Sequence, residues 1–398
     1  MHSHISLRQL FLSHNAQTSL FPLLLEFERA EGVYLYNKDG KSWIDLIAGI
    51  GVSSLGHGRP EIKQAITEQV DRYLHLMVYG EYVLAPQVLF AQKLTQLLDP
   101  SLNCVYFVNS GTEAVEGAMK LAKRYTGRQQ IFAFNHSYHG STQGALSVMG
   151  NEEFKSAFRP LLPQINFLDL NNHDQLLLIN ESTACVILET IQGEAGVRIP
   201  SFTYMVELRK RCSATGTLLI LDEIQCGMGR TGKLFAFEHY GIIPDILLLA
   251  KSLGGGMPLG AFISSNKIMS ALSENPVLGH ITSFGGHPVC CAAAIAALEI
   301  LIRENLTSFV EEKSQLFASL LTHQKIKQIR RKGLMIAIEF ENFKENKVII
   351  DRCIAKGVIV DWFLHDSSSM RICPPLSIST DQIKEACAII LDSISESI

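Results

Sequence analysis

The chain contains 398 residues, of which 47% are hydrophobic and 19% are charged, and its formal net charge is −4. This length exceeds one average domain, and the apolar content allows a large buried core, which argues against global disorder. Because acidic and basic residues are interspersed, the composition excludes a strong electrostatic footprint for nucleic acid or for an anionic membrane surface.

The nine cysteines are expected to be reduced and mostly buried. Their number is odd, no pair has C-x-x-C spacing, and several lie in apolar runs such as residues 184–188, so we expect neither disulfides nor a metal site. The apolar run at residues 20–25 is short, follows no basic region and precedes Glu26 and Glu28. We therefore expect a cytoplasmic protein without a signal peptide or a membrane span.

Taken in chain order, the sequence predicts three parts. Residues 1–58, with a strand-like stretch at 32–36, form an N-terminal segment that is expected to pack with the C-terminal unit. Residues 59–295 form a large domain in which short apolar runs alternate with helical periodicity. Residues 296–398 form a smaller α+β domain, with a strand at 335–340 and a final helix from residue 380. A long helix with one break, from residue 292 to residue 321, leads into this domain.

The large domain is predicted to contain a mostly parallel sheet. Its strands are expected at residues 105–108, 131–134, 185–188, 218–221, 246–249 and 259–263, with helices between them, as at 114–125 and 202–214. Continuously apolar strands separated by helices are typical of an α/β fold in which helices cover both faces of the sheet. Ligands of such sheets bind beyond the carboxyl ends of the strands.

The first candidate site follows the strand at 105–108. There Asn109-Ser110-Gly111-Thr112-Glu113 opens a helix, and Gly111 lets a ligand approach the backbone. A helix N-terminus offers unpaired N–H groups and the positive end of the helix dipole, which would stabilise a phosphate. The alternative is a plain capping box, since Ser110 and Glu113 have the S-x-x-E spacing.

Two further strands end in ionisable side chains. Asp222 ends the apolar run at 218–221, and a carboxylate there needs a cationic or hydrogen-bonding partner. Lys251 follows the run at 246–249 and precedes three glycines, which let a large group come close to the backbone. Partial desolvation makes a lysine amine a nucleophile, as Schiff-base chemistry requires. The alternatives are an internal salt bridge for Asp222 and a surface position for Lys251.

The sequence Gly227-Met228-Gly229-Arg230-Thr231-Gly232-Lys233 matches G-x-G-x-x-G but is predicted to be a loop. A P-loop needs Ser or Thr after the lysine, and Leu234 stands there. A dinucleotide fingerprint should open a helix after the first strand of a βαβ unit, whereas this stretch follows Asp222 by a few residues.

Together these segments resemble the class-III (omega) aminotransferases, a subgroup of pyridoxal-phosphate (PLP) fold type I that includes the ornithine, acetylornithine and 4-aminobutyrate enzymes. The resemblance covers nearly the whole chain, from Gly32-Val33-Tyr34-Leu35-Tyr36 to Met370-Arg371-Ile372-Cys373-Pro374-Pro375. Its most specific block runs from Leu221-Asp222-Glu223-Ile224-Gln225 to Lys251. The resemblance implies PLP as the cofactor and aminotransferase activity.

The resemblance implies a role for each residue that matches the motifs. Lys251 would carry the cofactor as a Schiff base and move the proton, and Asp222 would keep the pyridine nitrogen protonated so that the ring accepts carbanion electrons. Gln225 would hydrogen-bond the phenolic oxygen of the ring, and Tyr138 and Ile224 would contact its two faces. The other implied cofactor contacts are Ser110, Gly111, Thr112, His139, Glu189, Thr282 and Ser283.

The phosphate would lie on Gly111 and Thr112, and in this family a hydroxyl from the neighbouring subunit completes that site. Ser283, in Thr282-Ser283-Phe284-Gly285-Gly286, stands at that position, which implies a homodimer with active sites at the interface. The resemblance gives no role to His287, which replaces the usual asparagine.

Glu194 and Arg371 resemble the substrate switch of the family. The arginine would bind the α-carboxylate of glutamate or 2-oxoglutarate in a bidentate fork, and the glutamate would neutralise it when the reacting end carries no carboxylate. Two positions depart from the ornithine-type site for the distal carboxylate: Ser141 replaces an arginine, and Ile50 replaces a tyrosine. The donor is therefore left open among ornithine-, acetylornithine- and ω-amino-acid-like compounds, and Tyr82 is a further candidate contact.

Two alternatives remain open at this stage. An aminomutase, decarboxylase or racemase of the same fold would keep Lys251 and Asp222 but would need no external amino acceptor. A non-catalytic PLP-binding protein is the other, and the intact set of Lys251, Asp222 and Gln225 argues against it.

Overall fold

The computed structural model describes residues 5–397, and a seven-stranded sheet lies at its centre. In spatial order its strands are β4 (Cys104–Val108), β10 (Gly260–Ser264), β9 (Ile246–Leu249), β8 (Leu218–Asp222), β7 (Thr183–Glu189), β5 (Gln130–Phe134) and β6 (Ile165–Leu168). β10 runs antiparallel to β4 and β9, and the other neighbours are parallel. The predicted α/β fold with a mostly parallel sheet is confirmed.

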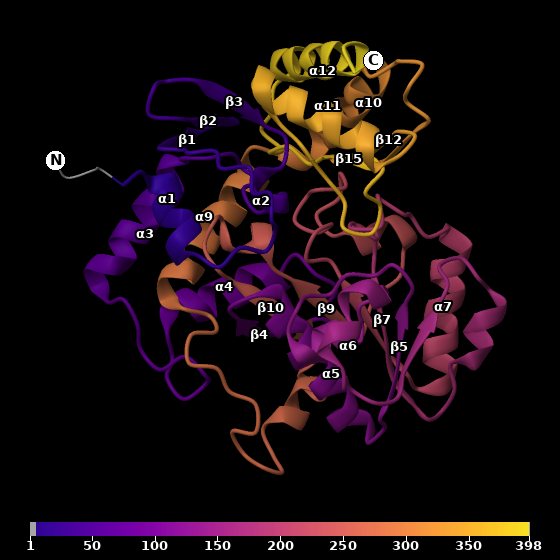
Figure 1. The fold of residues 1–398 in the computed structure, drawn as a ribbon. Coiled ribbons are helices and arrows are strands. Elements are labelled where there is room, and N and C mark those ends of the chain that lie inside the picture. The colour runs from indigo at the N-terminus through magenta and orange to yellow at the C-terminus, as the bar shows by residue number, and fades with distance from the viewer. Residues whose placement is uncertain (1–4, 398) are drawn as a thin grey trace.

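Helices cover both faces of this sheet (Figure 1). The helices of this region are α3 (Pro60–Arg72), α4 (Ala85–Thr95), α5 (Gly111–Thr126), α6 (Gln143–Ser147), α7 (Phe202–Thr215), α8 (Asn266–Met269) and α9 (Pro288–Arg303), and α3 packs mainly against α9. Successive residues of β7 point to opposite faces: Val186 belongs to the apolar cluster that includes α7 and α9, and Ile187 to the cluster that includes α5. Burial on both faces explains why the strands are continuously apolar.

Two smaller sheets, each with four strands within the described residues, lie beside the large one. One consists of β1 (Arg29–Glu31), β2 (Tyr34–Tyr36), β3 (Ser42–Asp45) and β13 (Val358–Ile359), and the other of β11 (Gln328–Lys332), β12 (Met335–Glu339), β15 (Ser369–Ile372) and β14 (Asp361–Trp362). Figure 1 shows β1–β3 next to the C-terminal helices α10 (Val310–Leu320), α11 (Phe343–Lys356) and α12 (Thr380–Ser395). The parallel pairing of β3 with β13 joins the two ends of the chain.

The remaining helices are short. They are α1 (Leu7–His14), α2 (Ala48–Gly51) and the 3₁₀ turns η1 (Glu152–Phe154), η2 (Ser156–Phe158), η3 (Asp174–Leu178), η4 (Ala236–Tyr240), η5 (Lys251–Gly254), η6 (Ser270–Leu272) and η7 (Leu306–Phe309). Of the helices in the described part of the chain, none combines the length and the apolar character that a membrane span requires. The nine cysteines are unpaired and eight are buried, as expected. The division at residues 58 and 295 stays a prediction.

The structure differs from the sequence expectation in three places. The long helix expected from residue 292 is α9, which begins at Pro288 because the His287 ring accepts the N–H of Val289. Its break falls at Asn305, which has a left-handed φ of 48°. The strand expected at 32–36 is shorter and begins at residue 34. The edge strand β6 was not predicted, because Asn166 interrupts its apolar run.

The glycine-rich stretch 227–232 is a series of turns, as predicted, and it contains a buried arginine. Arg230 is 1% exposed, and its guanidinium donates to Ser54 Oγ at 2.9 Å, to the carbonyl of Leu334 at 3.3 Å and to the carbonyl of Pro374. These acceptors come from the N-terminal and C-terminal parts of the chain. Arg230 therefore ties both ends of the chain to the large sheet.

Replacement of Arg230 by alanine is expected to lower the free energy of unfolding by about 3 kcal/mol or more, because it leaves buried acceptors without a donor. Lys233→Ala is the matched control, since Lys233 is an exposed cation in the same loop and its loss should cost less than about 0.5 kcal/mol. Urea denaturation of both variants measures the difference. Equal losses would contradict the role given to Arg230.

Candidate active site

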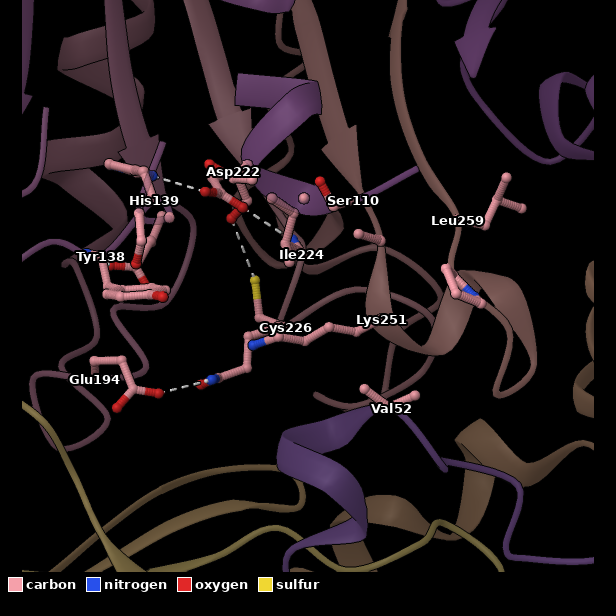
Figure 2. Close-up of a pocket in the computed structure, with 18 of the residues that line it drawn as sticks. Val52, Ser110, Tyr138, His139, Glu194, Asp222, Ile224, Cys226, Lys251 and Leu259 are labelled. Carbon is pink, nitrogen blue, oxygen red and sulfur yellow. Dashed lines mark hydrogen bonds and ion pairs between the residues drawn. The ribbon is translucent and has the colours of Figure 1, made fainter. Parts of the chain in front are cut away.

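A cavity of about 530 Å³ lies beyond the carboxyl ends of the central strands (Figure 2). The loops after β4, β5, β7, β8 and β9 all contribute to its wall. Sequence-predicted residues that line it are Ser110, Gly111, Thr112, Tyr138, His139, Ser141, Glu189, Glu194, Asp222, Ile224, Gln225 and Lys251. The parallel strands thus bring residues more than a hundred positions apart to one place.

Asp222, the last residue of β8, carries a buried carboxylate that faces this cavity. Its Oδ2 lies 2.7 Å from Nδ1 of His139, and its Oδ1 accepts the N–H of Ile224 at 3.0 Å (Figure 2). Nε2 of His139 is buried and has no hydrogen-bond partner among residues 5–397. The carboxylate is held in place by protein groups and can serve as the counter-ion of a cationic ligand.

Lys251 follows β9 and is held in an uncommon backbone conformation. Its φ is 50°, in the left-handed region that residues other than glycine seldom adopt, and such conformations are frequent at active sites. Burial lowers the pKa of the ammonium group, although the carboxylate of Glu194 opposes this change. A lysine amine with a lowered pKa is a better nucleophile and base near neutral pH.

The N-terminus of α5 forms another part of the wall. The Ser110 hydroxyl accepts the N–H of Glu113 at 3.3 Å, so the capping interaction exists, and the same turn lines the cavity. Gly111 is required by close packing: a Cβ there would lie 2.9 Å from Cδ1 of Ile224. At Gly140, where φ is +121°, a Cβ would collide with the Thr112 side chain. The first turn of α5 is thereby fixed against the loop that follows β5.

Glu189, at the end of β7, anchors two loops of the wall. Its carboxylate accepts the N–H groups of Tyr138 at 2.8 Å and Gly193 at 3.0 Å. Burial raises the pKa of this carboxyl to about 7, against the opposing effect of His139. Both hydrogen bonds of the Glu189 carboxylate are therefore with backbone N–H groups.

Glu194 and Arg371 form a buried ion pair at the edge of the cavity. Glu194 Oε2 lies 2.6 Å from Nη2 of Arg371 and accepts the N–H of Leu364 at 3.1 Å, and its Oε1 accepts from Nε2 of Gln225 at 3.2 Å. Burial alone would raise the pKa of Glu194, but Arg371 and Lys251 outweigh it, so the pKa lies below its usual value. Of the two side chains, Glu194 lines the cavity and screens Arg371 from it.

Five predicted site residues do not line this cavity within one chain, and one of them is Arg371, which lies behind Glu194. Ile50 and Tyr82 are exposed elsewhere, Ser283 is exposed, and the Thr282 hydroxyl accepts from Nδ2 of Asn109 at 3.1 Å. Sequence reasoning also missed Asp361, which lies beside Arg371. No motif points to Asp361, and only the pairing of β14 with β15 identifies it.

The fold and the site define a transaminase of PLP fold type I. The crystal structure of ornithine aminotransferase from Toxoplasma gondii superposes with a TM-score of 0.90, covers 97% of this chain and 93% of that chain, and is 27% identical. Adenosylmethionine-8-amino-7-oxononanoate aminotransferase from Methanocaldococcus jannaschii gives a TM-score of 0.91 at 29% identity, with 98% of each chain covered.

The sequence comparisons name the family. The model for class-III aminotransferases matches residues 15–394, so the chain belongs to this family. Acetylornithine aminotransferase from Methanopyrus kandleri is 39% identical over 98% of this chain and 99% of its own length. The enzyme of the same name from Aquifex aeolicus is 35% identical over 92% of this chain and 96% of its own length.

The residues around the cavity fit pyridoxal phosphate, the cofactor typical of this family. The ring nitrogen needs an anion, and Asp222 is a buried carboxylate already held by His139. The phosphate needs N–H donors, and the first turn of α5 borders the cavity. The aldehyde carbon needs a nearby amine, which Lys251 supplies from the same wall.

Replacement of Gly140 by alanine is expected to weaken PLP binding about ten-fold or more, because the added Cβ displaces Thr112 and with it the first turn of α5. Gly40→Ala is the matched control: Gly40 also has a positive φ, +82°, but a Cβ there meets nothing within 4 Å. Spectral titration of the PLP-free proteins measures the dissociation constants. If both variants bind PLP with the dissociation constant of the parent enzyme, the close packing at Gly140 does not contribute to cofactor binding.

Proposed function

We propose that this enzyme transfers the terminal amino group of an ornithine-, acetylornithine- or ω-amino-acid-like donor to 2-oxoglutarate, which gives glutamate. The buried pair of Glu194 and Arg371 is the observation that carries the proposal. An arginine behind a movable carboxylate suits a pocket that must bind a substrate α-carboxylate in one half-reaction and none in the other.

The two members of this pair are held differently. Arg371 lies in β15, in the middle of a sheet, whereas Glu194 lies in the loop after β7. The main-chain carbonyl of Glu194 accepts the N–H of His365 at 3.0 Å, so the proposed movement is a rotation of the Glu194 side chain and leaves its backbone in place. When the α-carboxylate of glutamate enters, Glu194 turns aside and the guanidinium binds the substrate. When the donor presents only its amino-bearing carbon, Glu194 returns.

Lys251, Asp222 and Tyr138 perform the central steps of the proposed reaction. When bound, PLP supplies the electron sink for the substrate carbon. Lys251 Nζ would take the proton from that carbon and deliver it to the C4′ atom of the cofactor, which its lowered pKa favours. Asp222 would keep the ring nitrogen protonated, and Tyr138 would contact the ring.

The other cofactor contacts follow from their positions. Gly111 and Thr112 would bind the phosphate, Ile224 would contact the ring face, and Gln225 would donate to the phenolic oxygen. Ser110, His139 and Glu189 complete the set of contacts from the same chain.

We further propose a homodimer in which Thr282 and Ser283 complete the phosphate site of the partner. Exposed apolar side chains near this segment support it, namely Leu74, Tyr82, Val83, Val277, Ile281 and Phe284. A second copy of the chain would remove them from water. Analytical ultracentrifugation distinguishes a dimer from a monomer.

The nine unpaired cysteines favour a reducing compartment, so we place the enzyme in the cytoplasm.

The relatives named acetylornithine aminotransferase support the donor class. The part of the site that would bind the distal carboxylate differs from the ornithine-type pattern. Ser141 lines the cavity where the resemblance leads one to expect an arginine. The distal carboxylate of a donor would therefore find a hydroxyl there, and Ile50 and Tyr82 would act only if the dimer brings them close.

Absorbance of the purified protein tests the proposed function. A band near about 420 nm is expected for PLP held by a lysine, and it should convert with glutamate and with one other amine. The amines to test are ornithine, N-acetylornithine, lysine, 4-aminobutyrate, putrescine and β-alanine, each followed by 2-oxoglutarate and detection of glutamate. Failure to form glutamate with any donor would sink the proposed acceptor and revive the aminomutase, decarboxylase and racemase alternatives. A colourless protein that takes up no PLP would refute the cofactor assignment.

Glu194→Ala is expected to slow the half-reaction of the amine donor about ten-fold more than that of glutamate, because Arg371 loses its nearest counter-ion when no substrate carboxylate is present. Single-turnover rates, followed at the cofactor band, measure each half-reaction separately. Equal losses in the two half-reactions would show that Glu194 is not a substrate switch.

A further inference from the structure

Arg371 has a second carboxylate beside it, from Asp361. The two residues are cross-strand neighbours in the register of β14 and β15, and Asp361 Oδ1 lies 3.2 Å from Nε of Arg371. Glu194 bonds a different nitrogen of the guanidinium, Nη2. Both carboxylates therefore neutralise Arg371 at the same time.

The atoms through which Asp361 and Arg371 approach each other are buried. Arg371 is 4% exposed, and although the Asp361 side chain as a whole keeps 30% of its surface, its Oδ1 is buried. Within the described part of the chain, neither Oδ1 of Asp361 nor Nε of Arg371 has a hydrogen-bond partner. The interaction is therefore a charge pair in poor hydrogen-bond geometry, and it acts mainly through its field.

The two carboxylates are positioned by different parts of the fold. Strand pairing fixes Asp361 opposite Arg371, whereas Glu194 lies in a loop. When Glu194 turns aside, Asp361 stays. The cluster of Glu194, Arg371 and Asp361 also carries two negative charges against one positive, a net charge of −1 when all three are ionised. A substrate carboxylate that displaces Glu194 thus meets a guanidinium whose charge is still offset by Asp361.

We propose that Asp361 is a fixed second counter-ion of Arg371 that weakens the binding of substrate carboxylates at this arginine and so favours donors whose reacting carbon carries none. Asp361 acts through Arg371 and is a positioning residue, not a catalytic one. The inference rests on the proposed function, because it requires Arg371 to receive the α-carboxylate.

The ionisation of Asp361 supports this role. Burial raises the pKa of its carboxyl to about 6; Arg371 opposes the rise, and Glu194 and Asp45 add to it. Asp45 is itself paired with His57, and Lys251 and Cys373 face Arg371 from the other elements of the site. A bound substrate carboxylate adds a further negative charge and favours protonated Asp361. Binding should therefore take up a proton, and affinity should rise as the pH falls toward 6.

Asp361→Asn in the PLP-loaded enzyme tests the inference, because the amide keeps the shape and removes the charge. Glutarate is the probe, since it carries the carboxylates of the substrate but has no amino or oxo group to react. Its dissociation constant, measured by calorimetry at about pH 8, should fall about three- to ten-fold in the variant. The KM for glutamate should fall with it and kcat should change little, a split that a merely structural role would not produce.

Asp351→Asn is the matched control, since Asp351 is exposed on α11 and pairs with Lys347. It removes the same charge away from the site and should leave the glutarate constant unchanged. An unchanged constant in Asp361→Asn, or an equal change in both variants, would overturn the inference.

The parent enzyme gives a test that does not depend on how the variant folds. Its glutarate constant should fall from about pH 8 to about pH 6, and Asp361→Asn should lose most of this dependence. Glutarate and Glu189, whose pKa is raised to about 7, also titrate in this pH range. They titrate in the parent enzyme and in Asp361→Asn alike, so the difference between the two proteins reports on Asp361. No pH dependence in the parent enzyme would contradict the inference.

Arg371→Gln separates this inference from the proposed function. If it abolishes glutarate binding while Asp361→Asn changes nothing, Arg371 binds the carboxylate and only the role of Asp361 is wrong. If Arg371→Gln leaves glutarate binding intact, the Glu194–Arg371 switch itself fails, and the inference fails with it.

Discussion

The carboxylates around the cavity and the arginine behind it are buried, and a buried charge needs a partner within the protein. Asp222 is held by His139, which lies 83 residues away in the chain, and Arg371 by Glu194, which lies 177 residues away. An unpaired buried charge costs several kcal/mol, so the site exists only when these distant segments are correctly placed. The same requirement applies outside the site, where Arg230 joins the N-terminal and C-terminal parts to the large sheet.

The parallel sheet is what satisfies this requirement. Because β8 and β9 are neighbours and point the same way, Asp222 and Lys251 leave the sheet at one edge, and the loop after β4 adds the first turn of α5. The sheet itself is apolar on both faces and rigid, so it can hold Lys251 at a φ of 50° without relaxation. Function is thus concentrated in loops, and the strands supply their positions.

We propose that the Glu194–Arg371 pair lets one pocket handle two kinds of substrate. A fixed cation would favour carboxylates in both half-reactions, and a fixed neutral pair would favour them in neither. In the proposed switch the arginine stays in its strand and only the side chain of Glu194 moves, which would resolve this conflict. In the proposed role of Asp361, a second, stationary charge lies beside Arg371, and the strength of carboxylate binding would then depend on three side chains.

The sequence by itself determined the strand and helix order, the mostly parallel sheet and the residues that end its strands, because continuous apolar runs and turn residues are local signals. Asp222, Lys251 and Gly111 could be selected from their positions in that pattern, and the resemblance to a family selected Glu194 and Arg371. The edge strand β6 was not predicted from the sequence because Asn166 interrupts its run of apolar residues.

Only the tertiary structure decided which charges meet. His139 beside Asp222, Asp361 beside Arg371 and the acceptors of Arg230 depend on strand order, register and loop packing. These contacts join residues far apart in the chain, and the folded backbone sets the distances between them, which no local pattern encodes.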